Sequence, residues 1–225
     1  MAESESEESD SGTSWIDWFT SQKGNEFFCC IDEDYILDRF NLAGLNLEVS
    51  HFQYALDLIT DQLEHDLDPL TWEAVDRSAK HLYGLIHARW VITNKGLSLM
   101  ADKMKKGEFG KCPRVLCEEQ AVLPVGLVDI PGLKGVKLYC PRCEDIYIPP
   151  SKKQLGIDGA YFTSSLPHLV LQMYPNLIPS KSTQRYVPKI FGFKIHAIAE
   201  EHRYQDRIKV ENDLKKKNLL SLCEE

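Results

Sequence analysis

The sequence lacks the features that mark membrane proteins, secreted proteins and the common classes of enzyme. No stretch approaches the roughly eighteen consecutive apolar residues that a membrane span requires. The N-terminal run MAESESEESD is acidic, whereas a secretory signal peptide is basic at first and then apolar. HExxH, GxSxG, Walker A and dinucleotide-type glycine motifs are missing, and the histidines are scattered along the chain. These absences predict an intracellular protein without membrane contact and without catalytic residues.

Basic residues are almost missing from the first third of the chain. Residues 1–72 carry 17 acidic and 2 basic side chains, a balance of −15, although the formal charge of the whole chain is −8. The remaining residues therefore carry a balance of +7, and this asymmetry indicates separate roles for the two parts. The field of the acidic part is expected to attract cations and basic protein substrates.

Apolar residues are nearly absent from the first fourteen positions, where five serines stand among Glu and Asp. Because such a segment has nothing to bury, we predict a disordered acidic tail at 1–14. The aromatic cluster that follows it, WIDWF at 15–19, is too apolar to remain in water. We therefore expect the folded part to begin at Trp15.

Helical periodicity dominates the next ninety residues. One apolar stripe predicts a helix over 50–63 with Ser50 as its N-cap, and another predicts a longer helix beyond Pro69 that ends near Trp90. Two further helices are expected at 32–40 and around 97–104. Glycine, proline and cysteine become frequent beyond Gly107, so we expect a domain boundary there.

Alternating apolar residues predict two short strands beyond that boundary, one at 123–127 and one at 136–139. A short helix is expected at 166–174, a strand-like run at 187–195 and a charged helix from Ala197 onward. The fold class that these patterns predict is α+β.

Four of the seven cysteines stand in two pairs, with the spacing C-x4-C, 22 intervening residues and C-x2-C. An odd number of cysteines in a reducing compartment argues against a disulfide framework, and paired cysteines in Gly- or Pro-marked turns are typical of zinc sites. Four thiolates close the coordination shell, so we predict one structural Zn²⁺ per chain. Its ligands are Cys112, Cys117, Cys140 and Cys143.

Two questions about this region stay open on the residues alone. Basic residues near the cysteines could contact the phosphates of a nucleic acid, or they could offset the −2 charge of a four-thiolate zinc site and pair with nearby carboxylates. The alternative function is therefore a zinc-ribbon nucleic-acid-binding protein, which the acidic chain disfavours. The apolar residues around the site exceed what forty residues can bury on themselves. They either face another chain or pack on the helical half.

A longer series of motifs carries a family resemblance. The chain resembles the regulatory (beta) subunit of casein kinase II through WIDWF (15–19), GNEFFC (24–29), DEDYI (32–36), FNLAGLN (40–46), LYGLIHAR (82–89), FGKCPRVLC (109–117), VKLYCPRCEDIY (136–147), DGAYF (158–162) and VPKIFGFKIH (187–196). The resemblance implies a non-catalytic, zinc-dependent homodimer that joins two catalytic (alpha) subunits in an α2β2 tetramer, modulates their stability and substrate selection, and occurs in cytoplasm and nucleus.

The resemblance also implies the domain organisation. We expect the acidic tail at 1–14, a helical domain at 15–107, a zinc-ribbon dimerisation domain at 108–150, a segment docking the catalytic subunit at 151–199 and a charged helical extension at 200–225. The extension is expected to be an amphipathic helix or a partly ordered tail, and no role is assigned to it.

Site residues follow from the same resemblance. The dimer contacts fall on Pro113, Val115, Leu127, Val136 and Tyr139. The docking contacts fall on Lys189, Ile190, Phe191 and Phe193, although the two phenylalanines could equally be ordinary core residues.

Two acidic features complete the expected sites. Phosphorylation by the catalytic subunit falls first on Ser4, which has Glu7 three positions later, and on Ser6 once Ser9 is phosphorylated. The acidic loop falls on Asp61, Glu64, Asp66 and Asp68, and it is thin and interrupted by His65, so a polyamine response is not predicted.

Overall fold

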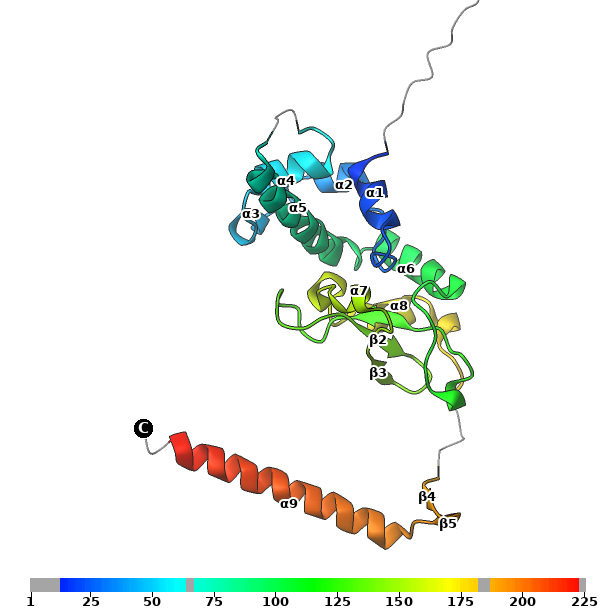
Figure 1. The fold of residues 1–225 in the computed structure, drawn as a ribbon. Helices are drawn as coiled ribbons and strands as arrows, with labels where there is room; N and C mark the ends of the chain where they lie inside the picture. Colours follow the sequence, from blue (N-terminus) through cyan, green and yellow to red (C-terminus); the bar gives the residue numbers. More distant parts are fainter. Residues whose placement is uncertain (1–12, 64–66, 182–186, 223–225) are drawn as a thin grey trace, which may run out of the picture. The chain divides into compact units, whose positions relative to one another are not determined.

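Helices build the part of the chain that precedes Gly107 (Figure 1). The structure, a computed structural model, describes residues 13–63, 67–181 and 187–222. The helices in this part are α1 (Trp15–Ser21), α2 (Glu33–Leu37), α3 (Leu45–Glu48), α4 (Phe52–Ile59), α5 (Pro69–Trp90) and α6 (Asn94–Lys106).

Local capping explains where the two long helices begin and end. Asp68 accepts a hydrogen bond from the Thr71 N–H at the start of α5, and Pro69 occupies the first turn, where a missing N–H costs nothing. The α6 helix ends at Gly107, whose φ of 75° is the left-handed conformation that favours glycine. The α4 helix begins later than predicted: His51, with a φ of 52°, is its N-cap, so the prediction for Ser50 is wrong.

A small antiparallel sheet follows the helices. Its strands lie in the order β1 (Leu123–Val125), β2 (Lys137–Cys140) and β3 (Asp145–Tyr147), after the short 3-10 helix η1 (Val115–Cys117). The sequence predicted the first two strands, and the third extends the sheet through the pairing of Tyr139 with Ile146. The chain continues through α7 (Lys152–Leu155), η2 (Gly159–Phe162), α8 (Leu166–Met173) and η3 (Pro175–Leu177). The α+β class is confirmed.

One hydrophobic core joins the helices to the sheet. The buried cluster runs from Trp15 to Val170 and includes residues on both sides of Gly107. The α5 helix packs on η2, and α6 packs on α8, which in turn contacts β1. A module of forty residues has too little interior to stand alone, which explains why it shares this core. The domain boundary near Gly107 stays a prediction.

The chain divides into two compact units, Met1–Ser182 and Thr183–Glu225. In the second unit the hairpin of β4 (Lys189–Ile190) and β5 (Phe193–Lys194) precedes the long helix α9 (Ala197–Leu222). The predicted strand-like run and the predicted helix from Ala197 are both confirmed. None of the helices in the described ranges has the length and apolar composition to cross a membrane.

His87 is a fully buried polar residue of the N-terminal unit. Its Nδ1 lies 2.8 Å from the carbonyl oxygen of Tyr161, and its Nε2 accepts a hydrogen bond from the Cys29 N–H at 3.2 Å. The carbonyl requires a proton on Nδ1 and the N–H requires a lone pair on Nε2, so the neutral imidazole fits both partners. Burial, with the charge of Lys103, lowers the pKa of His87 to about 4.

This burial predicts a loss of stability in mild acid. The His87 imidazole takes up a proton near pH 6.5 in the unfolded chain but only near pH 4 in the folded chain. The contribution of neutral His87 to the free energy of unfolding is therefore complete above pH 6.5 and declines as the pH falls toward 4. The shift corresponds to roughly 3 kcal/mol. Urea unfolding between pH 7 and 4 measures it, with His87→Gln as the comparison because glutamine can donate and accept without titrating. An equally steep pH dependence in His87→Gln would contradict the assignment.

Candidate metal centre

The four paired cysteines converge on one point. The Sγ atoms of Cys112, Cys117, Cys140 and Cys143 all lie within 4.8 Å of one another. A tetrahedron with zinc–sulfur bonds of about 2.3 Å has edges of about 3.8 Å, and the Cys112 and Cys143 sulfurs lie 3.9 Å apart. The donor set and its spacing therefore fit a tetrahedral thiolate site.

Tight turns aim each pair of sulfurs. Cys117 ends η1, and Glu118 and Glu119 after it both have positive φ, which reverses the chain so that the Gln120 carbonyl accepts from the Cys112 N–H at 2.8 Å. Cys140 ends β2, and the Glu144 N–H donates to its carbonyl at 2.8 Å across the second turn. Two compact loops thus face each other across the metal position.

The electrostatics of the cluster favour a bound cation. Three of the four cysteines are buried and Cys143 is half-buried. Burial and the neighbouring thiols raise the pKa of Cys117 to about 11. Burial also opposes ionisation of Cys143, but the hydrogen bond with the Tyr147 hydroxyl, 3.2 Å away, and neighbouring groups lower its pKa to about 7. Four thiols in this space ionise together only when a cation compensates their charge.

The basic residues around the cluster are engaged by carboxylates. Arg142 donates to the Cys117 carbonyl at 3.1 Å and pairs with Glu118 at 2.9 Å. Arg114 lies 3.7 Å from Asp145, and Lys111 pairs with Glu119. Lys111, Arg114 and Arg142 therefore have acidic partners, which agrees with the charge-balancing interpretation.

Comparison with known proteins identifies the family. The model of the casein kinase II regulatory subunit matches residues 14–194. The chain belongs to the casein kinase II regulatory subunit family. It is 56% identical over 199 residues to casein kinase II subunit beta of Schizosaccharomyces pombe, covering 88% of this chain and 86% of the relative. It is also 56% identical over 199 residues to casein kinase II subunit beta-2 of Neurospora crassa, a match that covers 88% of this chain and 70% of the relative. It is 47% identical over 225 residues to casein kinase II subunit beta' of Saccharomyces cerevisiae, a match that covers 97% of this chain and 87% of the relative.

Membership of the casein kinase II regulatory subunit family settles the broad function. The chain is a non-catalytic regulatory subunit with a four-cysteine cluster suited to zinc, and its family implies association with casein kinase II catalytic subunits. The resemblance inferred from the motifs is confirmed. The alternative of a nucleic-acid-binding zinc protein finds no support in these matches.

The predicted dimer residues divide between surface and interior. Val115 is 89% exposed, Leu127 is exposed to 45%, and Pro113 lies on the surface. Tyr139 is half-buried, with its ring 5.9 Å from that of His168. Val136 is fully buried in the chain's own core, so it offers no surface to a partner and its placement among the dimer contacts is corrected. Side chains alternate between the two faces of a strand. Val136 shares its face with Leu138, which is also buried, whereas Lys137 and Tyr139 on the other face are not buried.

Sequence reasoning missed further exposed apolar side chains on this module, two of them on or beside β3. Ile146 on β3 is 47% exposed, and Ile148 just beyond it is 66% exposed. Their signal was present in the sequence, as apolar residues flanking Tyr147 immediately after the second cysteine pair. Without the third strand there was no reason to place them on the surface.

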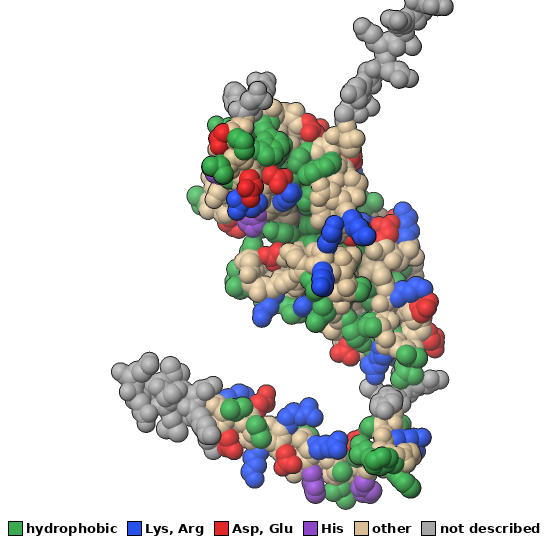
Figure 2. All heavy atoms as spheres, in the orientation of Figure 1, with side chains coloured by type: hydrophobic (Ala, Val, Ile, Leu, Met, Phe, Trp, Pro, Cys, Tyr) green, Lys and Arg blue, Asp and Glu red, His purple; other side chains and the backbone are tan. Residues whose placement is uncertain are grey.

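The predicted docking residues all lie exposed on the β4–β5 hairpin. Phe191 and Gly192 form its two-residue turn, with φ values of 47° and 87°. Phe191 is 96% exposed and Phe193 is 79% exposed, and Figure 2 shows hydrophobic side chains at the surface of this hairpin. Neither phenylalanine belongs to the buried core, so the interpretation as ordinary core residues is not supported.

The acidic sites are only partly within the described residues. Asp61 accepts two hydrogen bonds from the Trp15 N–H, both at 3.1 Å, and Asp68 caps α5. Both therefore have structural roles in addition to their charge. The other two members of the acidic loop, Glu64 and Asp66, and the predicted phosphorylation sites Ser4 and Ser6 lie outside the described residues.

Proposed function

We propose that this chain is a zinc-dependent homodimer that joins two casein kinase II catalytic subunits in an α2β2 tetramer. The observation that carries the proposal is the pairing of a preformed four-thiolate site with exposed apolar side chains on the same module. A single structural zinc per chain would fix the two loops and the sheet, because a closed thiolate shell leaves no position for a substrate. The metal would thereby hold the apolar surface in one shape.

The hairpin supports the second half of the proposal. A phenylalanine in the left-handed region is strained by about 1 kcal/mol or more, and exposing its ring adds a further cost. Both costs are offset if Phe191 and Phe193 enter an apolar groove of the catalytic subunit, as buried aromatic anchors do at many interfaces. The flanking Lys189 and Ile190 are also exposed and complete the docking surface.

Regulation would then be indirect. The dimer would stabilise the catalytic subunits and, through the charge of its acidic part, favour basic protein substrates. Phosphorylation at Ser4 and Ser6, and a cytoplasmic and nuclear location, remain predictions of the family resemblance. The role of α9 remains unassigned.

The dimer surface can be tested with charge substitutions that spare the metal. Val115→Glu combined with Leu127→Glu is expected to weaken dimerisation by about a hundredfold or more, because two buried apolar contacts would become desolvated charges. Native mass spectrometry measures the dimer fraction, and zinc content confirms that the site is intact. Leu47→Glu is the matched control, because Leu47 is equally exposed, at 87%, on α3. A zinc-loaded dimer that survives both substitutions would place the interface elsewhere.

A further inference from the structure

A basic pocket opens on the N-terminal unit. The pocket has a volume of about 390 Å³ and is formed by the end of α1 and the loop after it, by α5, and by the segment from α7 to η2. Figure 2 shows Lys and Arg side chains gathered on this face, between the helical part and the sheet-containing part. The pocket is separate from the metal centre and from every residue of the proposed dimer and docking surfaces.

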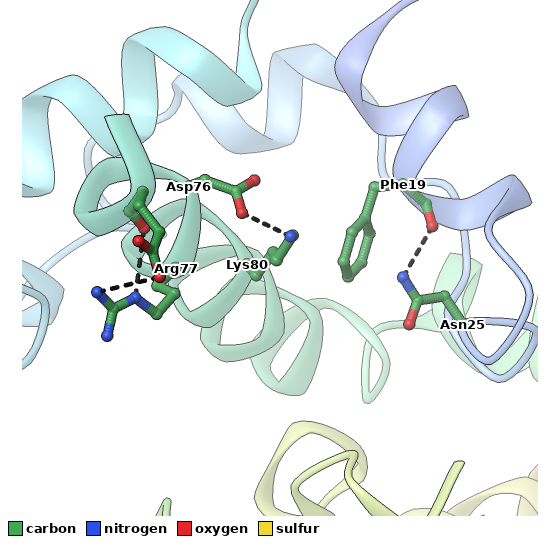
Figure 3. Close-up of polar contacts among 6 residues, drawn as sticks. Phe19, Asn25, Asp76, Arg77 and Lys80 are labelled. Carbon is green, nitrogen blue, oxygen red and sulfur yellow. Dashed lines mark hydrogen bonds and ion pairs between the residues drawn. The ribbon is translucent and has the colours of Figure 1, made fainter. Parts of the chain in front are cut away.

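Three cationic side chains line the pocket, and no carboxylate is among its lining residues within the described ranges. Lys80 Nζ lies 2.6 Å from Asp76, and Arg77 makes a loose 3.8 Å pair with Glu73. In the view of Figure 3 the Lys80 ammonium, paired with Asp76, points toward Phe19 on the α1 side, whereas the Arg77 guanidinium points away from Phe19. Within the described ranges, Lys153 has no ion-pair partner, so the pocket retains a net positive charge.

Close contacts hold the walls in place without filling the space. A Cβ on Gly24, which has a φ of 115°, would lie 2.8 Å from the Lys153 Cβ, and a Cβ on Gly84 would lie 2.6 Å from the Tyr161 ring. The Tyr161 hydroxyl is also 2.8 Å from the Nδ1 of His81. Two glycines and one hydrogen bond thus fix the position of the third wall against α5 and the loop after α1. A ligand would meet a preformed site, which lowers the ordering cost of binding.

The pocket combines charge with an aromatic surface. Phe19 and Phe28, both nearly buried, contribute to its lining with their rings 5.3 Å apart, and Ile157 contributes an aliphatic side. Cationic side chains attract anions, and phosphate oxygens in particular can accept from several donors at once. A volume of this size with both apolar and polar lining residues is typical of small-molecule sites.

We propose that this pocket binds a small organic phosphate, in which a phosphate group is attached to a flat apolar body. The phosphate would lie among Arg77, Lys80 and Lys153, and the apolar body would lie against Phe19. Because the ligand would bridge α5 and the segment from α7 to η2, its binding would also stabilise the N-terminal unit. The proposal does not depend on the dimer or on docking to the catalytic subunit.

Calorimetric titration of the zinc-loaded chain with three probes tests this site. AMP carries both chemical parts, inorganic phosphate carries only the anion and adenosine only the flat body. AMP is expected to bind about tenfold more tightly than either fragment, and Lys153→Gln or Arg77→Gln is expected to weaken it by about tenfold. Equal binding of AMP and adenosine, or no binding of AMP at millimolar concentration, would overturn the proposal.

The chain offers a matched pair of lysines as a control. Lys80 and Lys105 each pair with an Asp on their own helix, and each ammonium lies 5.8 Å from an aromatic ring centroid. Only Lys80 lines the pocket. Lys80→Gln is expected to weaken AMP binding and Lys105→Gln to leave it unchanged. If both variants lose affinity equally, the binding reflects general charge and the site is refuted.

Discussion

Chelation of the metal is expected to release one zinc ion per chain and to lower the melting temperature by roughly 10–20 °C, the effect of losing several kcal/mol from a chain of this size. Without the cation, the four thiols, which lie within 4.8 Å of one another, regain their protons. The turns at 112–117 and 140–143 are then no longer linked through a shared metal ion. Because β1 and β2 lie between these turns and β3 follows the second one, the sheet is expected to loosen with them. Scanning calorimetry with parallel metal analysis measures both quantities.

A cysteine comparison separates loss of the metal from loss of a thiol. Cys140→Ser is expected to reproduce the effect of chelation, because a serine hydroxyl is a poor substitute for a thiolate on zinc. Cys30→Ser is the control, since Cys30 is exposed and stands outside the four-sulfur cluster. A Cys140→Ser chain that keeps its metal and its melting temperature would show that the cluster is not the structural centre of the module.

Replacing both hairpin aromatics is expected to weaken binding of the catalytic subunit by about a thousandfold. This is the loss expected when two aromatic interface residues, each contributing about 2 kcal/mol of binding free energy, are removed. The variant Phe191→Ala plus Phe193→Ala should keep its zinc and its dimer, because neither side chain belongs to the buried core. Calorimetric titration with a casein kinase II catalytic subunit measures the loss.

An exposed aromatic elsewhere controls for general surface hydrophobicity. Phe40 is 84% exposed, comparable to the two hairpin residues, and lies before α3 in the N-terminal unit. Phe40→Ala is expected to leave the affinity for the catalytic subunit unchanged. An unchanged affinity in the double hairpin variant would instead remove this hairpin from the docking surface.

The four-cysteine cluster was predictable because a zinc site imposes a local chemical requirement on the sequence. Four thiolates, delivered in pairs by tight turns, leave a spacing that can be read from residue types alone. The long helices were predictable for a similar reason, since the apolar stripe of α5 and its start at Pro69 depend on neighbours along the chain. These features need little knowledge of distant contacts.

Features that depend on contacts between residues far apart in the sequence could not be predicted from the sequence. The sequence marks Val136 and Leu127 as apolar residues near the four cysteines, but only the folded structure shows the first buried in the core and the second exposed. Asp61 was predicted as part of a charged loop, whereas its carboxylate accepts from the Trp15 N–H 46 residues away. The basic pocket likewise arises from three segments that are far apart in the sequence.

The stoichiometry of the assembled complex tests the central claim most directly. Native mass spectrometry of the zinc-loaded chain, mixed with an excess of casein kinase II catalytic subunit, is predicted to show two copies of each subunit and two zinc ions. The metal-free chain is predicted to give no such complex. A zinc-loaded monomer that does not bind the catalytic subunit would contradict the account.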